Sequence, residues 1–291
     1  GITDFVSNGL SDLVLLKING STGAIMWAKN IGGSADDFGH AVTTDPTSAD
    51  VVVVGEFAHG IFIATTFLSS TAGSQDSLVV RYNSAGTFRW ATNFICAAND
   101  AVKGVKIDSA GNVLFTGYFQ GTINFGAGPQ QATVGSSFTD LYVAKLTSTG
   151  GYGWSKVFGE AFADTGLGIV LDSVGNPYFT GAFGQADINF GGTNLLNQGS
   201  DENIYLVKLS GFDGSHIWSK GFTHTANAEQ IGLGVAMDSA ANVIMSGGFK
   251  NQSNFGNGNL TSAGDFDAFV ASFTSASGAP LWSTNFGGSG A

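Results

Sequence analysis

The stretch 104-GVKIDSAGNVLFTGYF-119 decides the fold. Two apolar runs flank the polar segment DSAGN, in which Asp108 starts a tight turn and Gly111 supplies a position with positive φ. Alone, the stretch predicts a β-hairpin. Further copies are HAVTTDPTSADVVVVGEF at 40–57, GIVLDSVGNPYFTGAF at 168–183 and GVAMDSAANVIMSGGF at 234–249. The chain is therefore built from a repeated unit.

A second motif, DLVLLK in its first copy, fixes the period of the repeat. Its copies begin at Asp12, Asp76, Asp140, Asn203 and Asp267, in steps of 64, 64, 63 and 64 residues. A tryptophan follows each copy nine or ten residues after its sixth position: Trp27, Trp90, Trp154, Trp218 and Trp282. An apolar residue follows each tryptophan four positions later: Ile31, Phe94, Phe158, Phe222 and Phe286. We expect one domain over residues 1–291, with units that start near 12, 76, 140, 203 and 267.

Each unit is expected to hold four short strands. The first strand ends at the turn aspartate, which is Asp45, Asp108, Asp172 or Asp238. The second carries Gly55, Gly117, Gly181 or Gly247, the third is the DLVLLK-like run, and the fourth contains the tryptophan. No segment has an apolar period of 3.6 residues over the length of a helix. A repeated four-stranded unit predicts an all-β propeller, because radial stacking buries the faces that one blade cannot bury alone.

The combined pattern resembles a known repeat family. GVxxDSxGNVxxTGxF, then INFG or SNFG, then DLYVAK, then a Trp followed by FGG, resembles the bacterial SBBP-type β-propeller repeats over essentially the whole chain. The resemblance implies an exported bacterial protein of the kind that is often large and modular and generally lacks an assigned activity. It offers no catalytic residues to carry over.

The number of blades depends on how the two ends are read. The chain holds four hairpin copies but five copies of strands three and four. A five-bladed ring would need one more pair of first and second strands, about 35 residues at this period. We expect five blades, with the N- and C-terminal segments meeting in one blade so that the ring has no free edge. A fragment of a longer array is the alternative, as is a blade that a neighbouring chain completes.

Composition narrows the class of partner and the compartment. With a net charge of −11, the chain should attract neither nucleic acid nor an anionic membrane surface. The single cysteine, Cys96, excludes an internal disulfide framework and a multi-cysteine metal site. No apolar run reaches the roughly 18 residues of a membrane helix, so membrane insertion is not expected. The low share of charged residues, 11%, is typical of secreted or surface β proteins, and we expect an extracellular or cell-surface location.

One column of acidic residues could hold a cation. Asp37, Asp100, Asp164 and Gln230 lie eight residues before the turn aspartates and just before the first strands. First strands in propellers line the central channel, so these side chains would ring one channel mouth. Converging carboxylates suit calcium, and a calcium site on Asp37, Asp100 and Asp164 is the one cofactor considered. Capping of local turns is the alternative.

A binding site is expected where the repeat is broken. His40 and Lys103 occupy equivalent positions at which other units have Leu167 and Leu233. With the acidic column beside them, they form the most polar cluster in the sequence. The predicted ligand-binding residues are Asp37, His40, Asp100, Lys103 and Asp164. Hydrolase, zinc-protease and phosphate-loop motifs are absent, and no catalytic residue is predicted.

Three further features have two interpretations each. The tryptophan column is expected to be core between blades, with sugar-stacking platforms as the alternative. Lys17, Arg81, Lys145 and Lys208 form a column that we expect on a solvated surface, with a ring that binds an anionic ligand as the alternative. The apolar connection AHGIFIATTFLSSTAGSQ at 58–75 is either an interface or an extra strand packed on its blade.

Together these observations predict a binding or assembly scaffold that carries out no catalysis. Its partner would be a protein or a glycan on a propeller face or loop rim. The first alternative is a propeller-fold carbohydrate-active enzyme with its site at the channel mouth. The second is a structural spacer in a larger extracellular repeat protein.

Overall fold

The structure is a computed structural model that describes residues 5–71, 73–96, 98–133, 137–197, 201–224 and 229–290. All regular elements within these ranges are β-strands. In the same ranges, no helix long and apolar enough to cross a membrane is found. The predicted all-β class is therefore confirmed.

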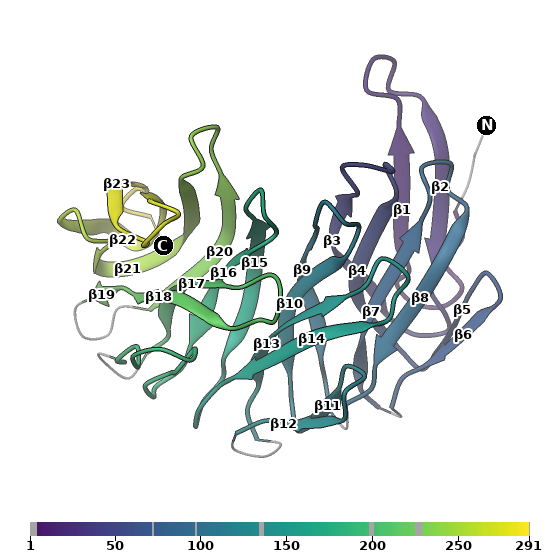
Figure 1. Cartoon of the computed structure of the whole chain (residues 1–291), viewed down its shortest axis with the longest axis horizontal. Helices are drawn as coiled ribbons and strands as arrows, with labels where there is room; N and C mark the ends of the chain where they lie inside the picture. The colour runs from purple at the N-terminus through teal and green to yellow at the C-terminus, as the bar shows by residue number, and fades with distance from the viewer. Residues whose placement is uncertain are drawn as a thin grey trace.

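Four antiparallel sheets follow one another along the chain (Figure 1), three of four strands and one of five. In each of them the four strands of the repeat lie in sequence order. Sheet 2 contains β3 (Asp37–Thr44), β4 (Val51–Ala58), β7 (Gln75–Tyr82) and β8 (Phe88–Phe94). Sheet 3 contains β9 (Ala101–Ile107), β10 (Val113–Phe119), β13 (Asp140–Leu146) and β14 (Tyr152–Phe158). Sheet 4 contains β15 (Thr165–Leu171), β16 (Pro177–Phe183), β17 (Asn203–Leu209) and β18 (His216–Gly221). Sheet 5 contains β20 (Gln230–Met237), β21 (Val243–Asn254), β22 (Asn259–Phe273) and β23 (Pro280–Phe286), with β19 (Thr223–His224) paired to β21.

Sheet 1 has two strands, β1 (Leu13–Ile18) and β2 (Ile25–Ile31), which pair with each other. They are the third and fourth strands of their unit. The chain ends were expected to meet in one sheet, yet β1 does not pair with any strand of sheet 5 in the described part of the chain. The reason is that each of the four pairs of first and second strands already completes its own sheet. Figure 1 shows sheets 1 and 5 at opposite ends of an arc.

The core is divided among the contacts between successive sheets. The first strands β3, β9, β15 and β20 are neighbours along the inner side of the arc (Figure 1). Between each two sheets lies one cluster of buried apolar side chains. Between sheets 2 and 3, for example, the rings of Phe94 and Phe115 stack with centroids 5.4 Å apart. Each sheet therefore depends on its neighbours for burial of its faces, as expected for a radial repeat.

Every first strand has a β-bulge at the same position. The pairing register shifts so that His40, Lys103, Leu167 and Leu233 are each the extra, unpaired residue of their strand. A bulge bends its strand and redirects the side chain of the extra residue. These four positions differ in residue type from unit to unit, and they are the positions that the bulges leave unpaired.

The glycine of each second strand is required by this bulge. A Cβ atom on Gly117 would lie 1.9 Å from the carbonyl oxygen of Ala101, two residues before the bulge residue Lys103. The corresponding distances at Gly55, Gly181 and Gly247 are 1.8, 1.9 and 1.9 Å. These overlaps explain the glycine of the recurring TGxF-like motif.

The apolar connection after β4 forms two extra strands, β5 (Gly60–Ile63) and β6 (Thr66–Ser69). Ile61 and Ile63 are buried against sheets 1 and 2, whereas Phe62 and Phe67 are exposed. Of the two predictions for this loop, the extra packed strand is the one that forms. A smaller hairpin, β11 (Thr122–Asn124) and β12 (Pro129–Gln131), occupies the same place beside sheet 3.

The steric role of the second-strand glycine predicts a large cost for a single methyl group. Gly117→Ala should lower the free energy of unfolding by about 2–4 kcal/mol, because the added Cβ collides with backbone that cannot move away. Urea unfolding measures the change. Gly20→Ala is the matched control, since no atom lies within 4 Å of a Cβ at that exposed turn. Equal unfolding midpoints for the two variants would contradict this steric role.

Candidate functional site

The bulge residues of sheets 2 and 3 form a polar cluster on the inner side of the arc. The Lys103 Nζ atom lies 2.8 Å from Nε2 of His40 and 3.4 Å from Oε2 of Glu56. His40 Nε2 is 3.2 Å from the same Glu56 oxygen. The Lys103 ammonium also lies 5.3 Å from the centre of the Tyr118 ring. The structure thus brings together His40 and Lys103, as the sequence predicts, and adds Glu56 and Tyr118.

Glu56 holds the two basic groups in place. Its burial opposes ionisation, but the hydrogen bond from His40 and the charge of Lys103 outweigh that effect, and the pKa of Glu56 is lowered. A neutral His40 can use Nε2 either to accept from Lys103 or to donate to Glu56, so these two contacts are alternatives. The cluster therefore has a fixed carboxylate and a hydrogen-bonding pattern that can change.

Sequence reasoning missed Glu56, although a signal was present. The equivalent residue is Tyr118 in sheet 3, Ala182 in sheet 4 and Gly248 in sheet 5. Glu56 is the one charged member of that column. Glu56 could have been identified because it is the single charge in an otherwise uncharged set of equivalent positions. Those positions also lie close to the variable positions of His40 and Lys103.

A hollow lies beside His40, where β1 meets β3. Its volume is about 240 Å³, and its walls include Leu13, Leu15, Val42 and Val53. Apart from His40, the side chains that line the hollow are apolar. A ligand group that entered it would therefore meet aliphatic side chains, backbone atoms and one hydrogen-bonding ring.

The acidic column is buried and holds backbone together. Asp37 accepts from the N–H groups of Gly33 and Ala58, at 2.7 and 3.2 Å. Asp164 accepts in the same way from Glu160 and Gly184, and Asp100 accepts from Ser77. In sheet 5 the buried Gln230 takes this position and donates to Ser253. Asp37 and Asp164 therefore fix the loops that lead into β3 and β15, whereas Asp100 is bonded to β7 of the preceding sheet and Gln230 to β21 of its own sheet.

The predicted calcium site is not formed by the residues that the structure describes. Asp37, Asp100 and Asp164 belong to three different sheets, and each is almost wholly buried. In the described ranges, no group of three or more His, Cys, Asp or Glu side chains is arranged to hold a metal ion. Backbone amides bind both carboxylate oxygens of Asp37 and of Asp164 and one oxygen of Asp100, which is the physical reason for the difference.

Burial changes the ionisation of the acidic column. It raises the pKa of Asp164 to about 7, and it raises the pKa of Asp100 well above its ordinary value. The pKa of Asp37 is also raised, again chiefly by burial. Desolvation disfavours a carboxylate even where amide donors partly compensate. Burial therefore disfavours the ionised form of all three acids.

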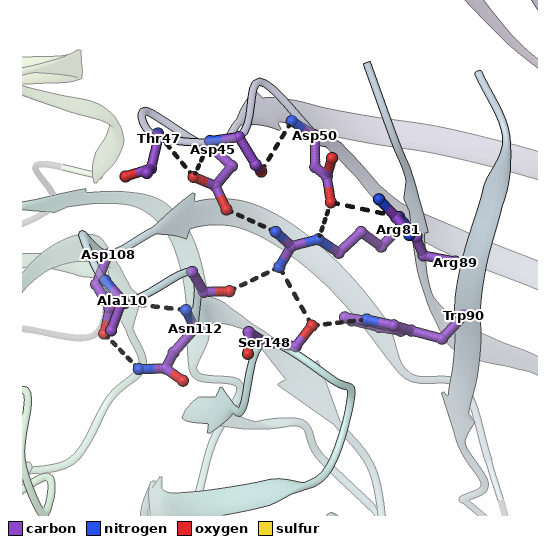
Figure 2. A network of polar contacts seen from close by, with 12 residues as sticks. Asp45, Thr47, Asp50, Arg81, Arg89, Trp90, Asp108, Ala110, Asn112 and Ser148 are labelled. Carbon is purple, nitrogen blue, oxygen red and sulfur yellow. Dashed lines mark hydrogen bonds and ion pairs between the residues drawn. The ribbon is translucent and has the colours of Figure 1, made fainter. Parts of the chain in front are cut away.

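The basic column is not a solvated surface, and that prediction is wrong. Arg81 is only 4% exposed, and Figure 2 shows its guanidinium between two acids of its own sheet. The distances are 2.6 Å to Asp45 and 3.1 Å to Asp50. Lys145 with Asp108, at 2.9 Å, and Lys208 with Asp172, at 3.2 Å, repeat the arrangement. The first turn of each sheet folds over the end of the third strand and covers the basic group.

The tryptophan column joins successive sheets, which confirms the core prediction for its first four members. Trp90 Nε1 donates to the carbonyl oxygen of Ser148 in sheet 3, at 3.0 Å, and Arg81 donates to the same oxygen (Figure 2). The other pairs are Trp27 with Ser84, Trp154 with Gly211 and Trp218 with Ser275, at 3.1, 3.2 and 3.2 Å. In each of these turns between a third and a fourth strand, one backbone carbonyl oxygen therefore accepts hydrogen bonds from the tryptophan and from the basic residue of the preceding sheet.

No protein-family model matches the chain. An uncharacterized WD repeat-containing protein of Acanthamoeba polyphaga mimivirus is 25% identical over 176 residues, a match that covers 55% of this chain and 12% of that protein. The crystal structure of a protein of unknown function from Bacteroides caccae aligns with 95% of this chain and 94% of its own. Its sequence identity is 11% and its TM-score is 0.43.

The buried ion pairs predict a contrast between two neighbouring arginines. Arg81→Gln should lower the free energy of unfolding by about 3–5 kcal/mol, because Asp45 and Asp50 would stay buried without their partner. Arg89→Gln, in the exposed arginine 3.8 Å from Asp50, should cost less than about 1 kcal/mol. Urea unfolding of both variants checks this. A small effect at Arg81 would show that its pairs are worth no more than surface contacts.

The raised pKa of Asp164 predicts a pH dependence of stability. Between about pH 4 and pH 7 the folded state holds a proton that the unfolded state has released, so the free energy of unfolding falls as pH rises. Asp164→Asn should reduce this slope by up to about 1.4 kcal/mol per pH unit. Urea unfolding across that range measures it.

The control for this variant is Asp213→Asn. The exposed Asp213 has its pKa lowered to about 2 by hydrogen bonds from Ser215, so it titrates outside the range. Its removal should leave the slope unchanged. Parallel stability curves for wild type and Asp164→Asn would show that Asp164 carries no proton in the folded state.

Proposed function

We propose that this chain is part of a secreted or cell-surface β-propeller that binds and assembles partners and carries out no catalysis. The observation that carries the proposal is the bulge column. His40, Lys103, Leu167 and Leu233 share one backbone geometry, lie on neighbouring first strands and differ in chemistry. A rigid repeated backbone in which one unpaired position changes from unit to unit is suited to binding a partner.

The propeller architecture is the finer part of the proposal. Each four-stranded sheet is then one blade, with its first strand on the inner side, and sheet 1 is the outer half of another. The WD-repeat name of the mimiviral relative is consistent with this, because WD repeats form propeller blades. We favour a ring of five blades, in which sheet 1 belongs to the fifth. The alternative remains an array with more repeats.

Location and family rest on the sequence. The low content of charged residues and the resemblance to SBBP-type repeats support an exported bacterial protein, and they stay proposals. The same evidence leaves a structural spacer in a larger extracellular protein as an alternative. A spacer would not need the His40, Lys103 and Glu56 cluster, which favours a binding role.

The chemistry of the cluster favours a glycan over a protein as its ligand. Lys103 and His40 can donate hydrogen bonds, Glu56 can accept them, and the Tyr118 ring lies beside the ammonium. Vicinal hydroxyl groups of a sugar match such a mixed set of donors and acceptors. The apolar hollow of about 240 Å³ next to His40 could receive a small substituent.

Catalysis by the same cluster is the less favoured alternative. A glycosidase needs one accessible protonated carboxyl group and one accessible carboxylate. Its lowered pKa favours the carboxylate form of Glu56, but the residue is only 7% exposed. Asp100 has a raised pKa, but it is 0% exposed and could not reach a substrate. The acid and base pair that hydrolysis requires is therefore incomplete.

The test uses residues that the chain itself places at this position. His40→Leu and Lys103→Leu copy the leucines of sheets 4 and 5, so the fold should persist. On a glycan array, wild-type protein should bind a subset of sugars, and each variant should bind roughly tenfold or more weakly, because a central polar contact is lost. Lys106→Leu, on the same strand, controls for charge.

Three results would count against the glycan-binding proposal. Equal binding by wild type and both leucine variants would place the ligand elsewhere. If no glycan bound, binding of a protein partner and a structural spacer role would be the two remaining interpretations. Hydrolysis of aryl glycosides by wild type, lost in Lys103→Leu, would favour the enzyme.

A further inference from the structure

The fourth strand of each unit has a bulge of its own, beside the turn that precedes the strand. In sheet 2 the register shifts between Arg81 and Tyr82, and Arg89 is the extra, unpaired residue. The equivalent extra residues are Met26, Gly153, Ile217 and Leu281. A bulge redirects the side chain of its extra residue. Arg89 is therefore the one charged member of a second set of bulge positions.

Sheet 2 departs from the repeat at two more positions around this bulge. Asp50 closes the first turn of sheet 2, where the other first turns have Asn112, Asn176 and Asn242. Arg81 stands where Lys17, Lys145 and Lys208 stand in other units, and Arg81 and Arg89 are the only arginines of the chain. The three departures lie together. Asp50 Oδ2 is 3.1 Å from Nε of Arg81 and 3.8 Å from Nε of Arg89.

The two arginines differ in how they are bound. The buried guanidinium of Arg81 donates to two acids and to two backbone carbonyl oxygens (Figure 2). The Arg89 side chain is 55% exposed, and in the described ranges its guanidinium makes no hydrogen bond. An ion pair as long and as exposed as that of Arg89 adds little to stability. Arg89 is therefore available to bind a ligand.

A hollow opens at this point between sheets 2 and 3. Its volume is about 360 Å³, and its lining includes Asp50, Arg89, Trp90 and Thr149, which together define the joint pocket. Sites for small molecules begin at roughly 300 Å³. The joint pocket is therefore large enough for a small ligand or for one residue of a larger one.

The length of the turn in sheet 3 accounts for the hollow. Turn 147–151 closes with a hydrogen bond of 2.7 Å from its first N–H to its last carbonyl oxygen, whereas the corresponding turn of sheet 4, 210–215, is one residue longer. Trp154, which packs on the longer turn, is 6% exposed, but Trp90 on the shorter turn is only half-buried. The shorter turn therefore leaves part of the Trp90 indole open to a ligand.

The available groups specify a ligand that has both a carboxylate and hydroxyl groups. The planar fork of an arginine such as Arg89 matches a carboxylate. Asp50 Oδ1 accepts no hydrogen bond in the described part of the chain, so it can accept one from a hydroxyl group, whereas its charge opposes a bare anion. Thr149 adds a hydroxyl at the rim, and Trp90 adds an apolar surface for a ring.

We propose that the joint pocket binds one uronic acid residue of an otherwise neutral glycan. The carboxylate of the sugar pairs with Arg89, its hydroxyl groups bond to Asp50 and Thr149, and its ring lies against Trp90. A single acidic residue is expected because the net charge of −11 opposes a polyanion. This site is on the third and fourth strands and is separate from the His40 and Lys103 cluster, so the inference goes beyond the proposed function.

The test follows the Trp90 indole N–H signal by NMR in the whole chain, with Trp90→Phe to assign it. The probes are the methyl glycosides of glucuronic, galacturonic and mannuronic acid, each beside its neutral parent sugar. At least one uronide should shift the signal and bind about tenfold more tightly than its parent. Arg89→Met, which copies Met26, should weaken uronide binding about tenfold to a hundredfold and remove the preference, because a charged hydrogen bond is lost.

Two further variants serve as a second test and as a control. Thr149→Phe adds a ring at an exposed turn, so it should fill the hollow and weaken uronide binding about tenfold without a change of charge. Lys106→Met removes one positive charge from β9 and should bind like wild type. Unfolding midpoints equal to that of wild type show that each variant is folded.

Four results would overturn the proposal. The first is a Trp90 signal that none of the uronides shifts. The second is uronide binding that Arg89→Met leaves unchanged, and the third is an equal loss in Lys106→Met. The fourth is binding of acetate or of N-acetylglutamate amide as tightly as any uronide, which would indicate a site for acidic peptides. Glycan binding through His40 and Lys103 is measured with its own variants, so either proposal can fail alone.

Discussion

The structure depends on one backbone carbonyl group per repeat. That oxygen lies in the turn between strands three and four, and it accepts hydrogen bonds from the tryptophan and the basic residue of the preceding sheet. Two donors on one acceptor fix the position of a whole sheet against the next. Glycine in the turn allows the indole ring to lie against the backbone, and the turn aspartates neutralise the basic group. Alignment, burial and charge balance are thus obtained at the same place in sheets 2, 3 and 4.

The bulge is the second constraint, and it separates what must repeat from what can vary. Gly117 and its equivalents must lack a side chain because a first-strand carbonyl oxygen occupies the space. The bulge residue itself forms no ladder pair, so its side chain is not held to the period-two alternation of its neighbours. Histidine, lysine and two leucines occupy that position in the same backbone. The side chain at this column can therefore change with little cost to the fold.

Much of the architecture could be predicted from the sequence, because strand alternation, turn residues and a fixed period are local or repeated signals. The tryptophan column is an example. The surroundings of Arg81 could not be predicted, since its partner Asp45 is far away in sequence and reaches it only when the first turn folds over the third strand. The direction in which the His40 side chain points could not be predicted either, because the bulge breaks the period-two alternation of side chains on which such predictions rest. The acidic column was misassigned because a carboxylate that binds backbone amides looks the same in sequence as one that binds a cation.

The joint between sheets is a property of the repeated unit and not of one pair of sheets. The outward positions of sheet 1 include Val14 and Leu16, and those of sheet 5 include Trp282 and Phe286. Their counterparts in sheet 4 are Tyr205, Val207, Trp218 and Phe222, all of which are buried in interior joints. The same kinds of side chain therefore recur at these positions whether or not a neighbouring sheet covers them, because the repeat carries both halves of the joint in every copy of its third and fourth strands.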